Sequence, residues 1–71
     1  MDITIHDRSG SVMPHHGLEG HIDPERHLFR MGYEIIDAPV PDGDYGDGEL
    51  FAVRLEGEVY AADEYDVAEI D

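Results

Sequence analysis

Hydrophobic and polar residues alternate over residues 3–6, Ile-Thr-Ile-His, and this alternation predicts a short strand. The next four residues, 7–10, are Asp-Arg-Ser-Gly, a composition that favours a turn and would end the strand. Residues 11–22 include one proline and two glycines and show little periodicity, so we expect a loop there.

A helix is predicted to begin after Asp23. The sequence Asp-Pro-Glu at 23–25 places a capping carboxylate before a proline at the first helical position and an acid in the first turn. We expect the helix to run to about Met31 and to stop at Gly32, because glycine readily adopts the left-handed conformation that follows a helix. Leu28, three residues before Met31, would share its buried face.

Further strands are predicted after the helix. Residues 33–36 and 50–55 fit strands, and residues 41–48 between them carry the glycines and aspartates of a long turn. Residues 66–70 alternate again and fit a last strand, with a single helix over 63–70 as the alternative.

A hairpin is predicted between residues 50–55 and 58–62, with its turn at Glu56-Gly57. A three-residue loop with Gly57 in the left-handed conformation matches apolar with apolar and base with acid, so we prefer it to a two-residue loop. Its register pairs Arg54 with Glu58, Val53 with Val59 and Phe51 with Ala61. Residues 61–65 would then form a single helical turn before the last strand.

Together these elements predict an α+β fold, a small antiparallel sheet of three to four strands with one helix packed on it. We expect a single domain over residues 1–71, near the lower size limit for a core without covalent staples. The alternative is an SH3-like small barrel in the C-terminal half, because the order of elements in that half resembles such a barrel.

The net charge of the chain restricts its possible functions more than the predicted elements do. The chain holds 18 acids, five histidines and four arginines but no lysine, cysteine or tryptophan, and its formal net charge is −14. The lack of cysteine excludes disulfides and thiolate metal sites. The scarcity of bases argues against direct binding to DNA, RNA or anionic lipid, because phosphate contacts require lysine and arginine. Residues 1–36 hold six acids and three arginines, a net of −3, whereas residues 37–71 hold twelve acids and one arginine, a net of −11.

No motif for catalysis or for a cofactor is present. The histidines are His6, His15, His16, His21 and His27. They lack the spacing of a zinc site, so solvated loop histidines are preferred to metal ligands. The acids at 42–49 resemble a calcium loop in composition, but counting from Asp42 puts Asp47 sixth and Val53 twelfth, where an EF-hand has glycine and glutamate. We therefore expect no enzymatic activity, no metal and no cofactor.

The acidic half is suited to imitating a nucleic acid. Residues two apart on an extended chain lie about 6.6–6.8 Å apart, and each strand of duplex DNA carries a phosphate about every 3.4 Å of its axis. Rows of carboxylates at phosphate-like separations are therefore available, with tyrosines among them as interface anchors. The predicted partner-binding residues are Asp37, Asp42, Asp44, Tyr45, Asp47, Glu49, Glu56, Glu58, Tyr60, Asp63, Glu64, Asp66 and Glu69.

In its size, its net charge and its lack of cysteine and catalytic motifs, the chain resembles the small acidic DNA-mimic inhibitors encoded by phages, including several anti-CRISPR proteins. The resemblance implies a stoichiometric inhibitor that occupies the basic DNA-binding cleft of a bacterial defence complex. A subunit of a CRISPR surveillance complex is one partner that this class implies. The class shares no sequence motif, so it assigns no role to any residue of this chain.

Two other functions remain open. A halophilic domain would spread acids over every face, whereas an SH3-like interaction module would make the acids secondary. The N-terminus lacks a basic stretch followed by an apolar segment, and no apolar run reaches the roughly 20 residues of a spanning helix. We therefore expect a soluble protein of the cytoplasm, that of the host cell if a phage encodes it, with no membrane contact.

Overall fold

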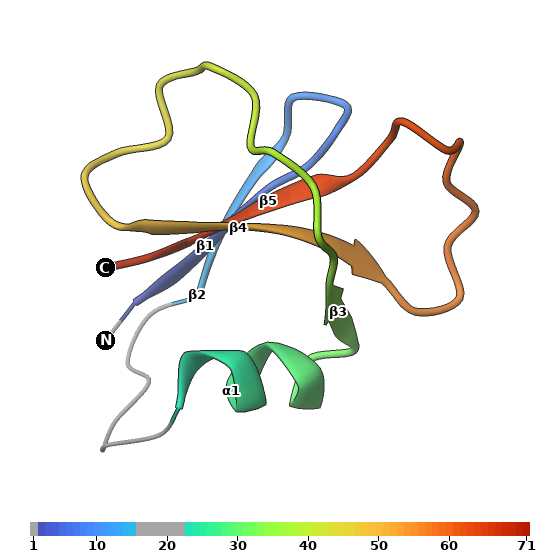
Figure 1. Ribbon diagram of the computed structural model, residues 1–71. Coiled ribbons are helices and arrows are strands. Elements are labelled where there is room, and N and C mark those ends of the chain that lie inside the picture. The colour runs from blue at the N-terminus through green and yellow to red at the C-terminus, as the bar shows by residue number, and fades with distance from the viewer. Residues whose placement is uncertain (1, 16–22) are drawn as a thin grey trace.

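The described part of the chain forms a five-stranded antiparallel sheet with one short helix against one face (Figure 1). The computed structural model describes residues 2–15 and 23–71. Neighbouring strands follow the order β2–β1–β5–β4–β3, so the last strand in the sequence is the central one in the sheet. The predicted α+β class is confirmed, but the sheet has five strands where three to four were expected.

The strand that the sequence does not predict is β2. β1 (Ile3–His6) is where it was expected, and β2 (Val12–His15) pairs with it along its whole length. Across the turn between them, the Asp7 amide donates a hydrogen bond to the Ser11 carbonyl at 2.7 Å. β2 lies at the edge of the sheet, carries a proline and starts with two exposed apolar residues, so it lacks the alternation of a half-buried strand. Residues 16–22 of the predicted loop lie outside the described residues.

The helix α1 (Pro24–Arg30) begins and ends where the sequence predicts. The Asp23 carboxylate caps it by accepting a hydrogen bond from the Glu25 amide at 3.1 Å. Gly32 follows the helix with φ at +92°, a conformation that glycine adopts without strain. Leu28 is completely buried, so packing of this side chain on the sheet supports a helix too short to be stable by itself.

Three further strands lie where they were predicted. β3 (Tyr33–Ile35) pairs with β4 (Glu49–Leu55), and β5 (Asp66–Ile70) lies between β4 and β1. The alternative helix over 63–70 is therefore wrong. The C-terminal half alone does not form a barrel either, because residues 37–71 supply only β4 and β5 and the N-terminal strands complete the sheet.

The predicted hairpin between β4 and residues 58–62 is wrong. β4 pairs with β5 instead, and Val53 lies opposite Asp66 rather than opposite Val59. The guanidinium of Arg54 gives a physical reason, because it donates hydrogen bonds of 3.0–3.3 Å to three carbonyl oxygens of the connecting segment. These carbonyls have hydrogen-bond partners without joining a ladder, so the segment is stable as a loop.

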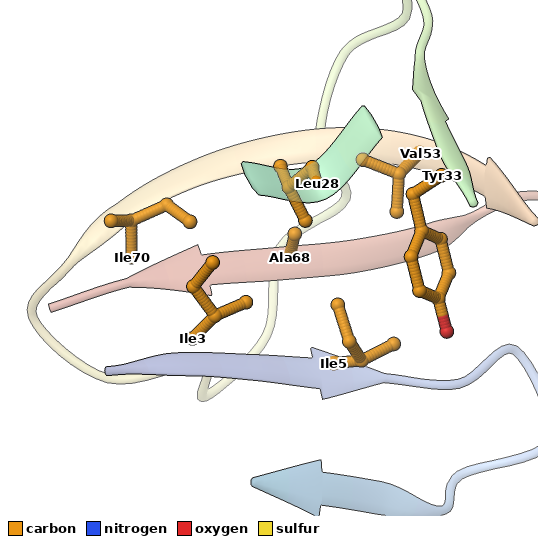
Figure 2. Packing of buried hydrophobic residues seen from close by; sticks show 7 residues of the cluster. All are labelled: Ile3, Ile5, Leu28, Tyr33, Val53, Ala68 and Ile70. Carbon is orange, nitrogen blue, oxygen red and sulfur yellow. The ribbon is translucent and has the colours of Figure 1, made fainter. Parts of the chain in front are cut away.

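The hydrophobic core lies between the sheet and α1, and Figure 2 shows its side chains meeting there. Its members are Ile3, Ile5, Leu28, Tyr33, Val53, Ala68 and Ile70. The members from β1 and β5 occupy alternate positions, and in β4 the partly buried Phe51 and Leu55 pack against the core on either side of Val53. This is why alternation in the sequence located these strands. Burial of each large apolar side chain contributes about 1.5–3 kcal/mol, and this packing fixes the sheet that carries the loops.

The connection from β3 to β4, residues 37–48, crosses to the side of the sheet away from α1 (Figure 1). We call it the 37–48 loop. Ala52 and Val67 lie opposite each other in the sheet and alternate with core residues, yet they are only 3% and 4% exposed. The sheet is therefore covered on both faces, by the helix on one and by an acidic loop on the other.

Candidate interaction surface

Exposed carboxylates gather on the 37–48 loop and at the start of β4. These are Asp37, Asp42, Asp44, Asp47 and Glu49. Within residues 2–15 and 23–71, none of them pairs with a basic group. Residues 37–49 hold five acids and no base, a net of −5, whereas residues 23–35, which include the helix, hold three acids and two arginines, a net of −1. The negative charge is thus concentrated on one connection.

Two tyrosines hold the 37–48 loop against the rest of the fold. The Tyr65 hydroxyl donates a hydrogen bond to the Pro39 carbonyl near the start of the loop. In the middle of the loop, the Tyr45 ring meets the His6 ring of β1 edge-on, with 5.1 Å between ring centres. Tyr45 is half-buried, so its predicted role as an anchor for a partner would involve only its exposed part.

The end of the loop lies close to β5, and at Gly48 a Cβ atom would lie 2.4 Å from the backbone oxygen of Ile70, so glycine is required there. The Gly48 amide donates a hydrogen bond to the Glu69 carboxylate at 3.3 Å. Gly46 has φ at +94°, and a Cβ atom there would lie 1.9 Å from a Glu69 carboxylate oxygen. Glu69 is half-buried and therefore positions the loop from beneath it.

Arg8 organises the second acidic segment, residues 56–65, which we call the 56–65 loop. Its guanidinium lies over the Tyr60 ring, 4.1 Å from the ring centre. Guanidinium nitrogens of Arg8 also lie 3.9 Å from the Glu58 carboxylate and 4.0 Å from the Glu64 carboxylate. Part of the negative charge of this loop is therefore balanced within the protein.

Arg54 also contacts the 56–65 loop. It donates hydrogen bonds to the carbonyls of Ala61, Ala62 and Glu64, and its guanidinium lies 5.8 Å from the centre of the Tyr60 ring. The Glu64 amide donates to the Ala61 carbonyl at 3.0 Å, which closes a turn at the predicted place, although this turn is not helical. Two of the four arginines thus order this loop.

Asp66 is only 3% exposed, unlike the other predicted contact acids. One of its oxygens accepts a hydrogen bond from the Arg8 amide at 3.0 Å and the other from the Tyr60 hydroxyl at 2.8 Å. Burial raises the pKa of the Tyr60 hydroxyl, and the Asp66 carboxylate adds to the rise. We therefore correct the assignment of Asp66 to a partner surface, because a buried carboxylate with both oxygens bonded is part of the framework.

A hollow of about 500 Å³, here called the inter-loop hollow, lies where the 37–48 loop, the 56–65 loop and the turn after β1 meet. Figure 1 shows the two loops rising on either side of that turn. Aromatic and charged side chains among its walls are His6, Tyr45, Tyr65, Asp7, Asp63, Glu64 and Arg8. The inter-loop hollow therefore has walls from both acidic loops.

A second hollow, of about 690 Å³, lies on the helix side between α1, β3 and the end of β4. Glu56, Glu58 and Tyr60 of the predicted contact set line this hollow. Phe29 also lines it and is 78% exposed. The predicted contact residues are therefore divided between two sides of the molecule rather than gathered in one row.

The regular spacing expected for rows of acids does not apply to the 37–48 loop. Asp42, Asp44 and Asp47 lie outside every described strand, so the two-residue repeat of extended backbone does not set their separation. The role of Arg8 was also missed, because its amide bonds to a carboxylate 58 residues away and no local pattern signals such a contact.

Within the described parts of the chain, no group of three or more histidines and acids could hold a metal ion. His16 and His21 lie outside the described residues. No helix in those parts is long and apolar enough to cross a membrane. Comparison with protein-family models, with curated proteins and with solved structures gave no match.

Proposed function

We propose that this protein is a DNA mimic that occupies the basic nucleic-acid-binding cleft of another protein, in the manner of an anti-CRISPR-like inhibitor of a bacterial defence complex. The observation that carries the proposal is the set of five exposed carboxylates over residues 37–49 that pair with no basic group of the described chain. Such a surface attracts clustered lysine and arginine, the same groups that bind phosphates.

The anchoring of the 37–48 loop supports the proposal. Immobilising a flexible side chain at an interface costs about 0.5–1.5 kcal/mol, and a surface that is ordered beforehand avoids part of that cost. Here Tyr65 bonds to Pro39, Tyr45 packs on His6, and Gly48 bonds to the sheet through a carboxylate. The carboxylates between these anchors are displayed on a framework that already exists in the free protein.

The uneven charge favours mimicry over a general adaptation to salt. A halophilic surface would be acidic on every side, yet the helix presents exposed Arg26 and Arg30, and residues 23–35 have a net charge of only −1. A mimic needs one strongly negative region, and residues 37–49 supply it with five acids and no base.

The proposal is tested with two triple variants of equal charge. The first replaces acids of the loop: Asp42→Asn, Asp44→Asn and Asp47→Asn. The second, a matched control, replaces acids elsewhere: Glu25→Gln, Glu34→Gln and Asp71→Asn. The unmodified protein is immobilised, partners are captured from a bacterial lysate and identified, and binding of the purified partner is measured with and without duplex DNA.

We expect capture of a DNA-binding protein, displacement by DNA, and affinity that falls steeply as salt rises. The loop variant should bind about tenfold more weakly, because three exposed charges at about 0.5 kcal/mol each sum to roughly that factor. The control variant should bind almost as well as the unmodified protein. Capture of no DNA-handling protein, or binding that DNA does not displace, would overturn the proposal, and equal losses in both variants would favour nonspecific charge attraction.

A further inference from the structure

The inter-loop hollow combines the two features that recognise a cationic side chain. Aromatic rings attract cations through their negative faces, and Tyr45 and Tyr65 both line the hollow. Carboxylates supply the opposite charge, and Asp63 lines the hollow without a hydrogen bond or ion pair to any described residue. Asp7 is a second carboxyl group at the hollow, and hydrogen bonds from Ser9 lower its pKa, so it is ionised near neutral pH.

The chain itself shows how such a combination holds a guanidinium. Beside the hollow, Arg8 stacks over the Tyr60 ring at 4.1 Å, with the carboxylates of Glu58 and Glu64 at 3.9 and 4.0 Å. The charge of Arg8 is therefore balanced by these two glutamates. Asp63 remains to balance a second cation, and Asp7, which lies close enough to Arg8 to be affected by its charge, adds to the negative charge of the wall.

One residue of the wall also carries a buried polar atom without a hydrogen-bond partner. His6 lines the hollow, and its Nε2 atom is buried with no hydrogen-bond partner among the described residues. Buried polar atoms in proteins nearly always have a hydrogen-bond partner, either a protein group or an ordered water molecule, so an unsatisfied one needs an explanation. This atom and the Tyr45 ring packed against the same imidazole lie on the side contributed by β1 and the 37–48 loop.

We propose that the inter-loop hollow seats an arginine side chain of the basic partner, stacked against Tyr45 or Tyr65 and paired with Asp7 and Asp63. The inference rests on the proposed function, because a DNA-binding cleft is what supplies the arginine. Arginine fits better than lysine, since a planar guanidinium stacks on aromatic rings and its forked donors match carboxylates. A phosphate or other anion is excluded by the charge of the walls.

The test needs no knowledge of the partner. The ¹⁵N-labelled protein is titrated with N-acetyl-arginine amide, and chemical-shift changes are followed by NMR. N-acetyl-citrulline amide, which has nearly the same shape but no charge, is the ligand control. Asp63→Asn removes a carboxylate from the hollow, whereas Asp47→Asn makes the same charge change on the loop outside the residues that line it.

We expect saturable shifts centred on Tyr45, Asp63 and Tyr65 with the arginine probe, and binding about tenfold weaker for citrulline. Asp63→Asn should weaken arginine binding at least threefold, and Asp47→Asn should change it less than twofold. Equal responses to the two probes, equal effects of the two variants, or shifts spread over all exposed acids would overturn the inference.

The two proposals fail separately. If the hollow binds arginine but no DNA-binding protein is captured, the arginine site is supported and the proposal of DNA mimicry is refuted. If DNA displaces this protein from its partner but the hollow does not bind arginine, the proposal of DNA mimicry stands. Distributed charge alone would then hold the partner.

Discussion

The hydroxyl of Tyr60 donates a hydrogen bond of 2.8 Å to the buried carboxylate of Asp66. The same hydroxyl accepts a hydrogen bond of 2.9 Å from the Leu55 amide at the end of β4. One phenol therefore joins the end of β4 to the start of β5, and its ring supports the Arg8 guanidinium. The 56–65 loop depends on this contact for its position, because Tyr60 belongs to that loop.

Replacing Tyr60 by phenylalanine should lower the free energy of unfolding by about 1–3 kcal/mol, because it leaves the Leu55 amide and one Asp66 oxygen without a partner. The measurement is urea denaturation followed by circular dichroism. Tyr45→Phe is the matched control, since the Tyr45 hydroxyl makes no hydrogen bond with the described residues and its loss should have little effect. Equal losses in the two variants would contradict the role given to the Tyr60 hydroxyl.

Stability should fall in strongly alkaline solution. Burial raises the pKa of both Tyr33 and Tyr60 above the ordinary value of 10.0. A group whose pKa is higher in the folded state contributes stability that is fully present below its unfolded pKa and is lost as pH rises through its folded pKa. The melting temperature should therefore decline as pH rises above about 10. Tyr60→Phe should show a smaller decline, and an equal one would assign the effect to other groups.

Alanine at Gly46 should cost more stability than alanine at Gly57. Both glycines have positive φ, at +94° and +89°, so each substitution adds backbone strain of about 1–3 kcal/mol. Only at Gly46 would the new Cβ also meet Glu69, at 1.9 Å, whereas nothing lies within 4 Å at Gly57. The difference between the two melting temperatures measures what it costs to displace the Glu69 carboxylate from the 37–48 loop. Equal melting temperatures would show that Glu69 moves aside without loss of stability.

Raising sodium chloride from about 20 mM to about 500 mM should raise the melting temperature, because salt screens the mutual repulsion of exposed carboxylates. The triple variant Asp42→Asn, Asp44→Asn and Asp47→Asn should respond less, since it removes three of the five acids on residues 37–49. Calorimetric scans at several salt concentrations make the comparison. A melting temperature independent of salt would show that these acids are compensated locally.

Local chemistry in the sequence determined the helix and four of the five strands. The cap at Asp23 and the glycine at Gly32 act through hydrogen bonds and backbone preferences of neighbouring residues, so they are visible without the fold. Alternation located β1, β3, β4 and β5 because their inward residues share one core. β2 gave no such pattern, since it lies at an edge with exposed apolar residues.

Composition likewise located the acidic half, but only the tertiary structure decided which strand pairs with β4 and which acids remain free. Residues 58–62 and 66–70 both fitted strands, and the sequence placed the first of them beside β4. In the fold, residues 66–70 take that place, because they also pair with β1 from the other end of the chain. The Arg8 amide donates a hydrogen bond to Asp66, 58 residues away, so this acid is part of the folded framework rather than of the free acidic surface. The Arg8 side chain also partly balances the charges of Glu58 and Glu64. Such contacts join segments that are distant in sequence, so their energy is absent from any local pattern and exists only once the sheet has formed.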